Sequence, residues 1–202
     1  MSSFICPICE IVIDLLQGLA AYIERQTDDA VIVLHTNGSH GPAYYQRYKK
    51  ELAAFQPSCD TNQIQDCTRD SLVNVYDNTI LHVDLVLDQT ITLLQKYQAQ
   101  FDTAMLYLSD HGESLGENGM YLHGAPYAIA PKEQTQVPMM LWTSPEFLPN
   151  RQINPVCLRR KAQTEAYSQD YLFHSVLRLM RVETTEYDVA LDLFNGCEQG
   201  PA

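Results

Sequence analysis

The sequence lacks a long apolar segment that is free of charge. Its most apolar stretch, residues 4–23, contains Glu10, Asp14 and Gln17, and acidic side chains are costly at the centre of a bilayer. The stretch also lacks a basic amino-terminal region and a clear cleavage site, so it is not typical of a signal peptide. Its apolar residues recur at helical spacing instead. We therefore predict no transmembrane segment, and an amphipathic helix that packs on a sheet.

Positive charge is also scarce. The chain has 13 Lys and Arg against 25 Asp and Glu, a formal net charge of −12. This balance argues against broad electrostatic binding to nucleic acid or to an anionic membrane face. Any contact with a phospholipid must then be local, through a metal or a small basic patch. With 46% hydrophobic and 19% charged residues over 202 positions, the chain is expected to form a single globular domain.

Six cysteines indicate an oxidising compartment such as the bacterial periplasm. Cys59 and Cys67 bracket a short polar loop, and this spacing predicts a disulfide that closes the loop. A single C-x-x-C at the amino terminus could be a redox pair, half of a metal site or a mispaired remnant. The sequence leaves open how the remaining four are paired: Cys6, Cys9, Cys157 and Cys197.

Strand-like and helix-like segments alternate along the chain. Short apolar runs predict strands at residues 30–34, 104–108 and 137–142. Helical periodicity is strongest over residues 70–97 and returns over residues 167–180. This order predicts an α/β layered sandwich with a mainly parallel sheet and helices on both faces.

The most informative segment follows the second predicted strand. The apolar run ends in Asp110, His111 and Glu113, and His123 lies twelve residues after His111 in a glycine-rich loop. Open α/β sheets place ligand sites at the carboxyl ends of their strands, and an acid beside an imidazole suits zinc. An isolated Asp-His pair would more often cap backbone groups in a polar loop. The length, the glycines and the position after a strand favour a metal site here.

Three motifs carry a resemblance to a known family. They are SDHGESLGENGMYLHG at 109–124, HTNGSHGPAYYQRY at 35–48 and CDTNQIQDC at 59–67. Together they resemble the periplasmic domain of the phosphoethanolamine transferases that modify lipid A, which belong to the alkaline phosphatase and sulfatase superfamily. The similarity runs from about Cys9 to about Cys197.

The resemblance implies a setting for the chain. It implies an alkaline phosphatase/sulfatase-like fold, incomplete at the amino terminus, with residues 1–202 forming one partial catalytic domain. The family acts at the periplasmic face of the bacterial inner membrane and is linked to polymyxin resistance. Its donor is phosphatidylethanolamine and its acceptor is lipid A. We therefore expect the chain to be the carboxy-terminal portion of such an enzyme.

The resemblance also implies roles for five residues. Asp110 and His111 correspond to ligands of the principal zinc, while His40 and His123 correspond to histidines that hold the transferred phosphoryl group or a second zinc. Because Glu113 follows the ligands directly, it is expected to line the catalytic site with His40 and His123; the alternative is that it simply accepts hydrogen bonds from the backbone. One or two zinc ions would polarise a phosphoryl oxygen and activate a nucleophile. Standing alone, His40 could also be a turn residue that bonds to the backbone.

The expected nucleophile is missing from the matched region. The family uses a threonine nucleophile and an acidic zinc ligand that both lie upstream, and Thr36 matches a different family position. We therefore expect the isolated chain to bind zinc and to be inactive in transfer. The alternatives are a hydrolase of the same superfamily, either a sulfatase or a phosphatase, and a truncated, non-catalytic metal-binding remnant.

Overall fold

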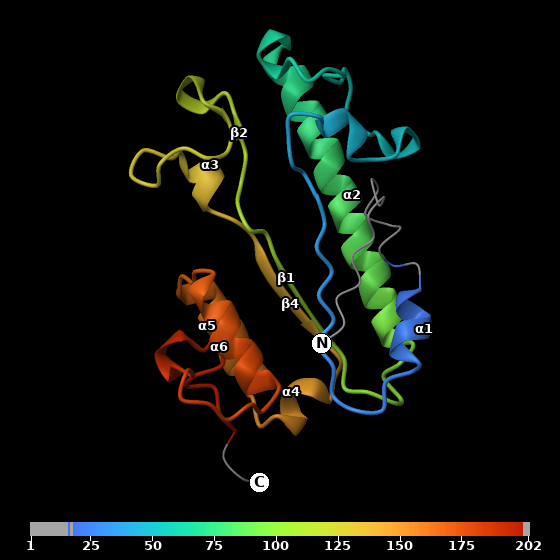
Figure 1. The fold of residues 1–202 in the computed structure, drawn as a ribbon, viewed down its shortest axis with the longest axis vertical. Helices are drawn as coiled ribbons and strands as arrows, with labels where there is room; N and C mark the ends of the chain where they lie inside the picture. The colour runs from blue at the N-terminus through green and yellow to red at the C-terminus, as the bar shows by residue number, and fades with distance from the viewer. Residues whose placement is uncertain (1–15, 17, 200–202) are drawn as a thin grey trace. The chain divides into compact units, whose positions relative to one another are not determined.

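A computed structural model describes Leu16 and residues 18–199 (Figure 1). The chain divides into two compact units. Unit 1 comprises the residues up to Leu93 together with Ser109–Pro138, and unit 2 comprises Leu94–Leu108 together with the residues from Met139 onward. In the part of the chain that is described, no helix is both long enough and apolar enough to cross a membrane.

Unit 1 is organised by one long helix, α2 (Arg69–Gln95). The hydroxyl of Thr68 accepts a hydrogen bond from the Ser71 amide at 3.2 Å, which satisfies one of the free N–H groups at the start of the helix. The helix predicted for residues 70–97 is therefore confirmed. A shorter helix, α1 (Leu19–Ile23), covers only the end of the amphipathic helix predicted for residues 4–23. The rest of that prediction, with Cys6 and Cys9, lies outside the described residues.

The buried face of α2 packs against the long loop that precedes it. This loop contains three short 3-10 turns, η2 (Tyr44–Gln46), η3 (Lys50–Leu52) and η4 (Ile64–Asp66). The predicted disulfide between Cys59 and Cys67 is confirmed. The loop and α2 share a core that consists of Tyr44, Tyr48, Cys59, Ile64, Leu72 and Val75. The buried side chain of Asn78 fixes the loop further, because it accepts from the amides of Ala54 and Phe55 at 2.9 and 3.0 Å.

Unit 2 is built on two strands, β1 (Ala104–Leu108) and β4 (Met139–Thr143). The strand predicted for residues 104–108 has the predicted bounds, and the one predicted for 137–142 is present with shifted ends. Two of the helices that follow are α4 (Phe147–Asn150) and α6 (Asp170–Leu179), and α6 confirms the helix predicted near residues 167–180. The core of the unit consists of Phe147, Leu148, Ile153, Leu193, Phe194 and Cys197.

A helix that was not predicted, α5 (Pro155–Thr164), lies between α4 and α6. The Asn154 side chain caps it by accepting from the amides of Val156 and Cys157, and Pro155 occupies its first turn. A disulfide joins Cys157 in α5 to Cys197, forty positions away. The pairing of these two cysteines, which the sequence left open, is thereby fixed.

A buried carboxylate holds the carboxy-terminal part of unit 2 together. Asp192, only 1% exposed, accepts from the Tyr187 hydroxyl at 2.7 Å and from Arg178 Nη1 at 3.1 Å. Its other oxygen accepts from the Phe194 amide at 3.0 Å. Arg178 also pairs with the half-exposed Glu198 at 3.0 Å.

The predicted parallel pairing is wrong for β1 and β4. They are antiparallel, with Ala104 opposite Thr143 and Leu108 opposite Met139. A parallel neighbour needs a crossover that returns the chain to the start of the first strand. Residues 109–138 provide none, because the Ser109 amide donates to the Pro138 carbonyl at 3.3 Å and so brings the two ends of the excursion together. In the described residues, every strand pairing is antiparallel.

The strand predicted for residues 30–34 is also absent. This segment is irregular, and its apolar side chains face solvent, with Val31 49% and Val33 74% exposed. Apolar β-branched residues favour a strand only where a partner strand and a buried face are available. The described chain places no strand beside them.

Candidate metal centre

The segment after β1 turns sharply and presents His111. The Asp110 carboxylate accepts from the His111 amide at 3.0 Å, and the Ser109 hydroxyl donates to the His111 carbonyl at 2.8 Å. The next residue, Gly112, passes so close to the Glu133 backbone that a Cβ at this position would collide with it. The Gly112 amide donates to the Gln134 carbonyl at 3.0 Å. Glycine is therefore required here, and the turn that carries His111 is fixed from both sides.

A small hairpin then brings His123 back beside Glu113. Strands β2 (Ser114–Leu115) and β3 (Tyr121–Leu122) pair with Ser114 opposite Leu122. Because the strands are antiparallel, the residue before Ser114 faces the residue after Leu122. His123 Nδ1 accordingly lies 3.0 Å from Glu113 Oε1.

His40 comes from the loop that leads into η2. Its amide donates to the Asn37 carbonyl at 3.0 Å, which closes a turn, and Arg47 donates to its carbonyl at 3.1 Å. The following residue, Gly41, donates its amide to Glu113 Oε1 at 3.3 Å. The loop of His40 is thus tied to the hairpin that carries His123.

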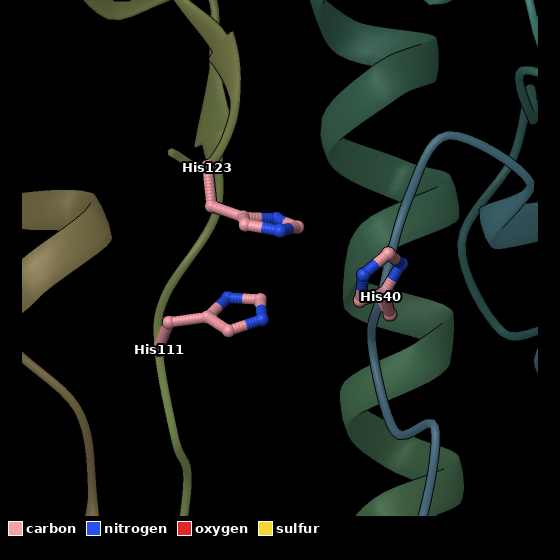
Figure 2. Close-up of side chains that lie close together, drawn as sticks. All are labelled: His40, His111 and His123. Carbon is pink, nitrogen blue, oxygen red and sulfur yellow. The ribbon is translucent and has the colours of Figure 1, made fainter. Parts of the chain in front are cut away.

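The three imidazole rings converge (Figure 2). His111 and His123 stack with their ring centroids 3.8 Å apart, and His40 faces them with its centroid 4.9 Å from that of His123 and 5.7 Å from that of His111. One nitrogen from each ring lies within 4.8 Å of one from each of the others. All three residues belong to unit 1.

Hydrogen bonds fix which nitrogen of each ring carries the proton. His40 Nδ1 lies 2.7 Å from the Gly41 carbonyl, and His111 Nδ1 lies 3.0 Å from the Gly112 carbonyl. A carbonyl oxygen can only accept, so both Nδ1 atoms donate. The Glu113 carboxylate also only accepts, so His123 Nδ1 donates to it. In neutral rings, all three Nε2 atoms therefore keep a free lone pair, and neutral imidazole nitrogens with fixed partners suit a zinc ion.

Asp110 lies at the edge of this cluster. Its side chain is 78% exposed, and its Oδ1 lies 3.9 Å from His111 Nε2. It is not among the three groups whose ligand atoms converge. Of the five residues singled out from the sequence, the structure brings together His40, His111 and His123, with Glu113 directly behind His123.

The structure adds Tyr44 to the candidate site, a residue that the sequence analysis did not assign to it. Its hydroxyl donates to Glu113 Oε2 at 3.1 Å, and the residue is fully buried. Burial, followed by the charge of Glu113, raises the pKa of Tyr44 far above its usual range. Tyr44 therefore stays protonated and acts as a donor. Tyr44 and Tyr48 both lie in the core of unit 1.

Comparison with known proteins shows the family to which the chain belongs. The model of the sulfatase family matches residues 10–182, so the chain belongs to the sulfatase family. Within it, the chain is 54% identical over 185 residues to the phosphoethanolamine transferase EptA of Escherichia coli. That alignment covers 92% of this chain and 34% of the relative. The chain thus spans about a third of the length of the curated relatives that it matches.

Solved structures give the same result. The soluble domain of lipooligosaccharide phosphoethanolamine transferase A from Neisseria meningitidis superposes with a TM-score of 0.88 at 46% identity, covering 92% of this chain and 56% of that one. The C-terminal periplasmic domain of EptC from Escherichia coli, solved in complex with Zn, gives a TM-score of 0.66 at 20% identity. It covers 99% of this chain and 55% of that one, and at this identity the likeness concerns the fold.

Proposed function

We propose that the chain is part of the periplasmic catalytic domain of an inner-membrane phosphoethanolamine transferase. The complete enzyme would move phosphoethanolamine from phosphatidylethanolamine to lipid A. The observation that carries this proposal is the convergence of His40, His111 and His123, of which one ring nitrogen each lies within 4.8 Å of the others. The identity of 54% to a phosphoethanolamine transferase supplies the choice of reaction within the family.

The donor set suits one or two zinc ions. His111 and Asp110 would hold the principal ion, and His40 and His123 would hold a second ion or the phosphoryl group. Zinc would supply Lewis-acid stabilisation of charge on the phosphoryl oxygens. The solved EptC domain that contains zinc shares the fold, which is consistent with this assignment.

The residues of the chain itself would position and neutralise the phosphoryl group. An imidazole that is neutral offers its Nε2 lone pair to a metal, and one that is protonated donates from Nε2 to a phosphoryl oxygen. Phosphoryl transfer asks the protein mainly for such positioning and for charge neutralisation. The fixed Nδ1 bonds hold the rings for either use without further rearrangement.

We further propose that residues 1–202 belong to a single domain of the complete enzyme. Its parallel strands and its nucleophile would come from the two thirds of the relatives' length that this chain does not match. The isolated chain should then bind zinc without transferring phosphoethanolamine, because no covalent intermediate forms without an activated nucleophile.

Zinc titration tests the site. Replacing a direct ligand should cost more than the 10–100-fold typical of residues behind the ligands, so His111→Ala should weaken zinc binding by more than about 100-fold. His35→Ala is the matched control, because His35 is an exposed histidine of the same unit outside the converging group. Equal zinc affinity in wild type and His111→Ala would refute the site.

A transfer assay tests the activity. The chain is incubated with fluorescent phosphatidylethanolamine, with and without lipid A. No transfer is expected from the isolated chain, and robust transfer would show that it contains its own nucleophile. Cleavage of the donor that does not depend on lipid A would favour a hydrolase.

A further inference from the structure

We infer that Glu113 is the positioning residue of the centre: it sets the protonation pattern of the His123 ring and couples that ring to the loop of His40. The inference rests on the proposed function, since it concerns how the same three histidines are prepared for metal or phosphate. It gives Glu113 a role that acts through His123 rather than on the substrate.

Several hydrogen-bond donors meet at the carboxylate of Glu113. Glu113 Oε1 accepts from the Gly41 amide at 3.3 Å and from His123 Nδ1 at 3.0 Å. Glu113 Oε2 accepts from the Tyr44 hydroxyl at 3.1 Å. Three donors from two distant segments of the sequence therefore converge on a single side chain.

Glu113 is also much more deeply buried than its partner His123. The Glu113 side chain is 3% exposed, whereas that of His123 is 33% exposed. A carboxylate with both oxygens engaged and almost no accessible surface is not placed to meet a substrate or an ion. Its partner His123 is accessible, so the effect of Glu113 reaches the centre through the His123 ring.

His123 differs from the other two histidines in the acceptor of its Nδ1 proton. His40 and His111 each donate from Nδ1 to the carbonyl of the next residue, Gly41 or Gly112. These local backbone acceptors cannot be removed by substitution. His123 alone of the three relies on a distant side chain for its Nδ1 acceptor. A carboxylate at this position fixes the tautomer of the ring.

Glu113 also links the two sides of the centre, which are the loop that carries His40 and the hairpin that carries His123. Because Oε1 holds both the Gly41 amide and His123 Nδ1, one atom bridges the loop of His40 and the hairpin of His123. A Cβ on Gly41 would collide with Tyr44 and Leu122, so this backbone packs closely against the same tyrosine that anchors Glu113. Removing the carboxylate should loosen both sides together.

The tautomer of His123 can be read directly by NMR. Long-range ¹H–¹⁵N correlation on the full, zinc-free chain, with all rings neutral, distinguishes a proton on Nδ1 from one on Nε2. We expect Nδ1–H at His123 in the wild type and a shift toward Nε2–H in Glu113→Ala. His111 is the internal control and should keep Nδ1–H in both proteins, because its acceptor is the Gly112 carbonyl.

Glu113→Gln provides the conservative variant. The amide oxygen can still accept from Gly41 and His123, while the amide nitrogen donates to the Tyr44 hydroxyl, which can accept. This variant should therefore retain Nδ1–H at His123. Loss of a partner behind a ligand typically lowers metal affinity by about 10–100-fold, so Glu113→Ala should weaken zinc binding by that factor and Glu113→Gln by much less.

The outcomes separate this inference from the proposed function. Wild-type protein with Nε2–H at His123 would overturn the inference even if Glu113→Ala fails to fold. A folded Glu113→Ala with an unchanged tautomer and unchanged zinc affinity would also overturn it. Failure of the transfer assay would count against the proposed reaction alone, because neither the tautomer nor zinc binding depends on turnover.

Discussion

Each unit of the molecule contains a buried carboxylate that is held in nearly the same way. Glu113 in unit 1 accepts from a tyrosine hydroxyl, a backbone amide and a histidine. Asp192 in unit 2 accepts from a tyrosine hydroxyl, a backbone amide and an arginine. Both residues are nearly inaccessible: counted over the whole residue, Glu113 is 6% exposed and Asp192 is 1% exposed.

The basic partner makes the difference between the two clusters. Arginine is always charged and has donors only, so the Arg178–Asp192 pair can stabilise structure but offers no lone pair to a ligand. Histidine donates from one nitrogen and keeps a lone pair on the other. On the proposed function, the buried carboxylate of unit 2 therefore supports structure, whereas that of unit 1 prepares a ligand. A buried acid becomes informative about function only when its partner has a second, accessible atom.

The largest effect is expected at Asp192. Asp192→Ala leaves the half-buried Arg178 without its buried counter-ion, and breaking such a pair typically costs about 3–5 kcal/mol of unfolding free energy. Glu198→Ala removes the other, exposed partner of the same arginine and should cost less than about 1 kcal/mol. Urea denaturation of the two variants compares them. Similar losses in both would contradict a special role for the buried partner.

A smaller effect is expected from the matched tyrosines. Hydrogen bonds to charged groups contribute about 1.5–3 kcal/mol, so Tyr44→Phe should lower the unfolding free energy by about 2 kcal/mol. Tyr187→Phe should cost about 1 kcal/mol, because Arg178 still neutralises Asp192 and Tyr187 is only partly buried. If Tyr187→Phe proves the more damaging, the two clusters are not built alike.

The alkaline limb of stability adds a second readout for Tyr44. Its folded pKa lies above the unfolded value of about 10, because burial and Glu113 disfavour the phenolate. The unfolded chain then releases this proton first, so wild-type stability should fall as the pH rises above about 10. Tyr44→Phe lacks this contribution and should lose less stability between pH 9 and pH 11, as monitored by denaturation at each pH.

The smallest effect concerns a histidine with no carboxylate at all. His82 on α2 is 1% exposed, and neither of its ring nitrogens has a hydrogen-bond partner. Replacing it with leucine removes a buried, unsatisfied polar group, so His82→Leu should raise the unfolding free energy by about 1 kcal/mol at pH 7. This variant measures how much a buried imidazole lowers the unfolding free energy when no carboxylate accepts its hydrogen bond.

The stabilisation of His82→Leu relative to the wild type should increase as the pH falls. Burial, with a further contribution from Lys49, lowers the pKa of His82 below its usual 6.5. Below that pH the unfolded chain binds a proton that the native chain excludes, so wild-type stability falls as the pH falls. The difference from His82→Leu should widen by at most about 1.4 kcal/mol per pH unit. Denaturation between pH 7.5 and pH 5 checks this, with His35→Ala as the exposed control.

Local signals predicted much of the fold correctly. The apolar run at 104–108, the periodicity over 70–97 and the short spacing of Cys59 and Cys67 each depend on few neighbours, and each matches the structure. The start of α5 also had a readable signal, Asn154 followed by Pro155, which was overlooked. Strand direction and the fate of residues 30–34 depend on distant partners, so no local pattern could determine them.

The candidate site, too, was predictable from the sequence only in part. The resemblance pointed to His40, His111 and His123, which lie together. The anchoring of Glu113 depends on the register of the β2–β3 hairpin and on a tyrosine sixty-nine positions earlier in the chain. A carboxylate five residues after the end of a strand is equally compatible with a ligand, a surface group or a buried support. Only the three-dimensional contacts distinguish these roles.

The disulfide between Cys157 and Cys197 has a consequence for the order of events during biosynthesis. The two cysteines are separated by forty positions, whereas Cys59 and Cys67 are separated by eight. At synthesis rates of 5–20 residues per second, Cys157 emerges roughly 2–8 s before its partner exists. Cys59 and Cys67 are both made before Cys157, so this pair can form first, which would remove two competing thiols. The Cys59–Cys67 pair can thus be oxidised before Cys197 is made, whereas the Cys157–Cys197 crosslink must wait for forty further residues.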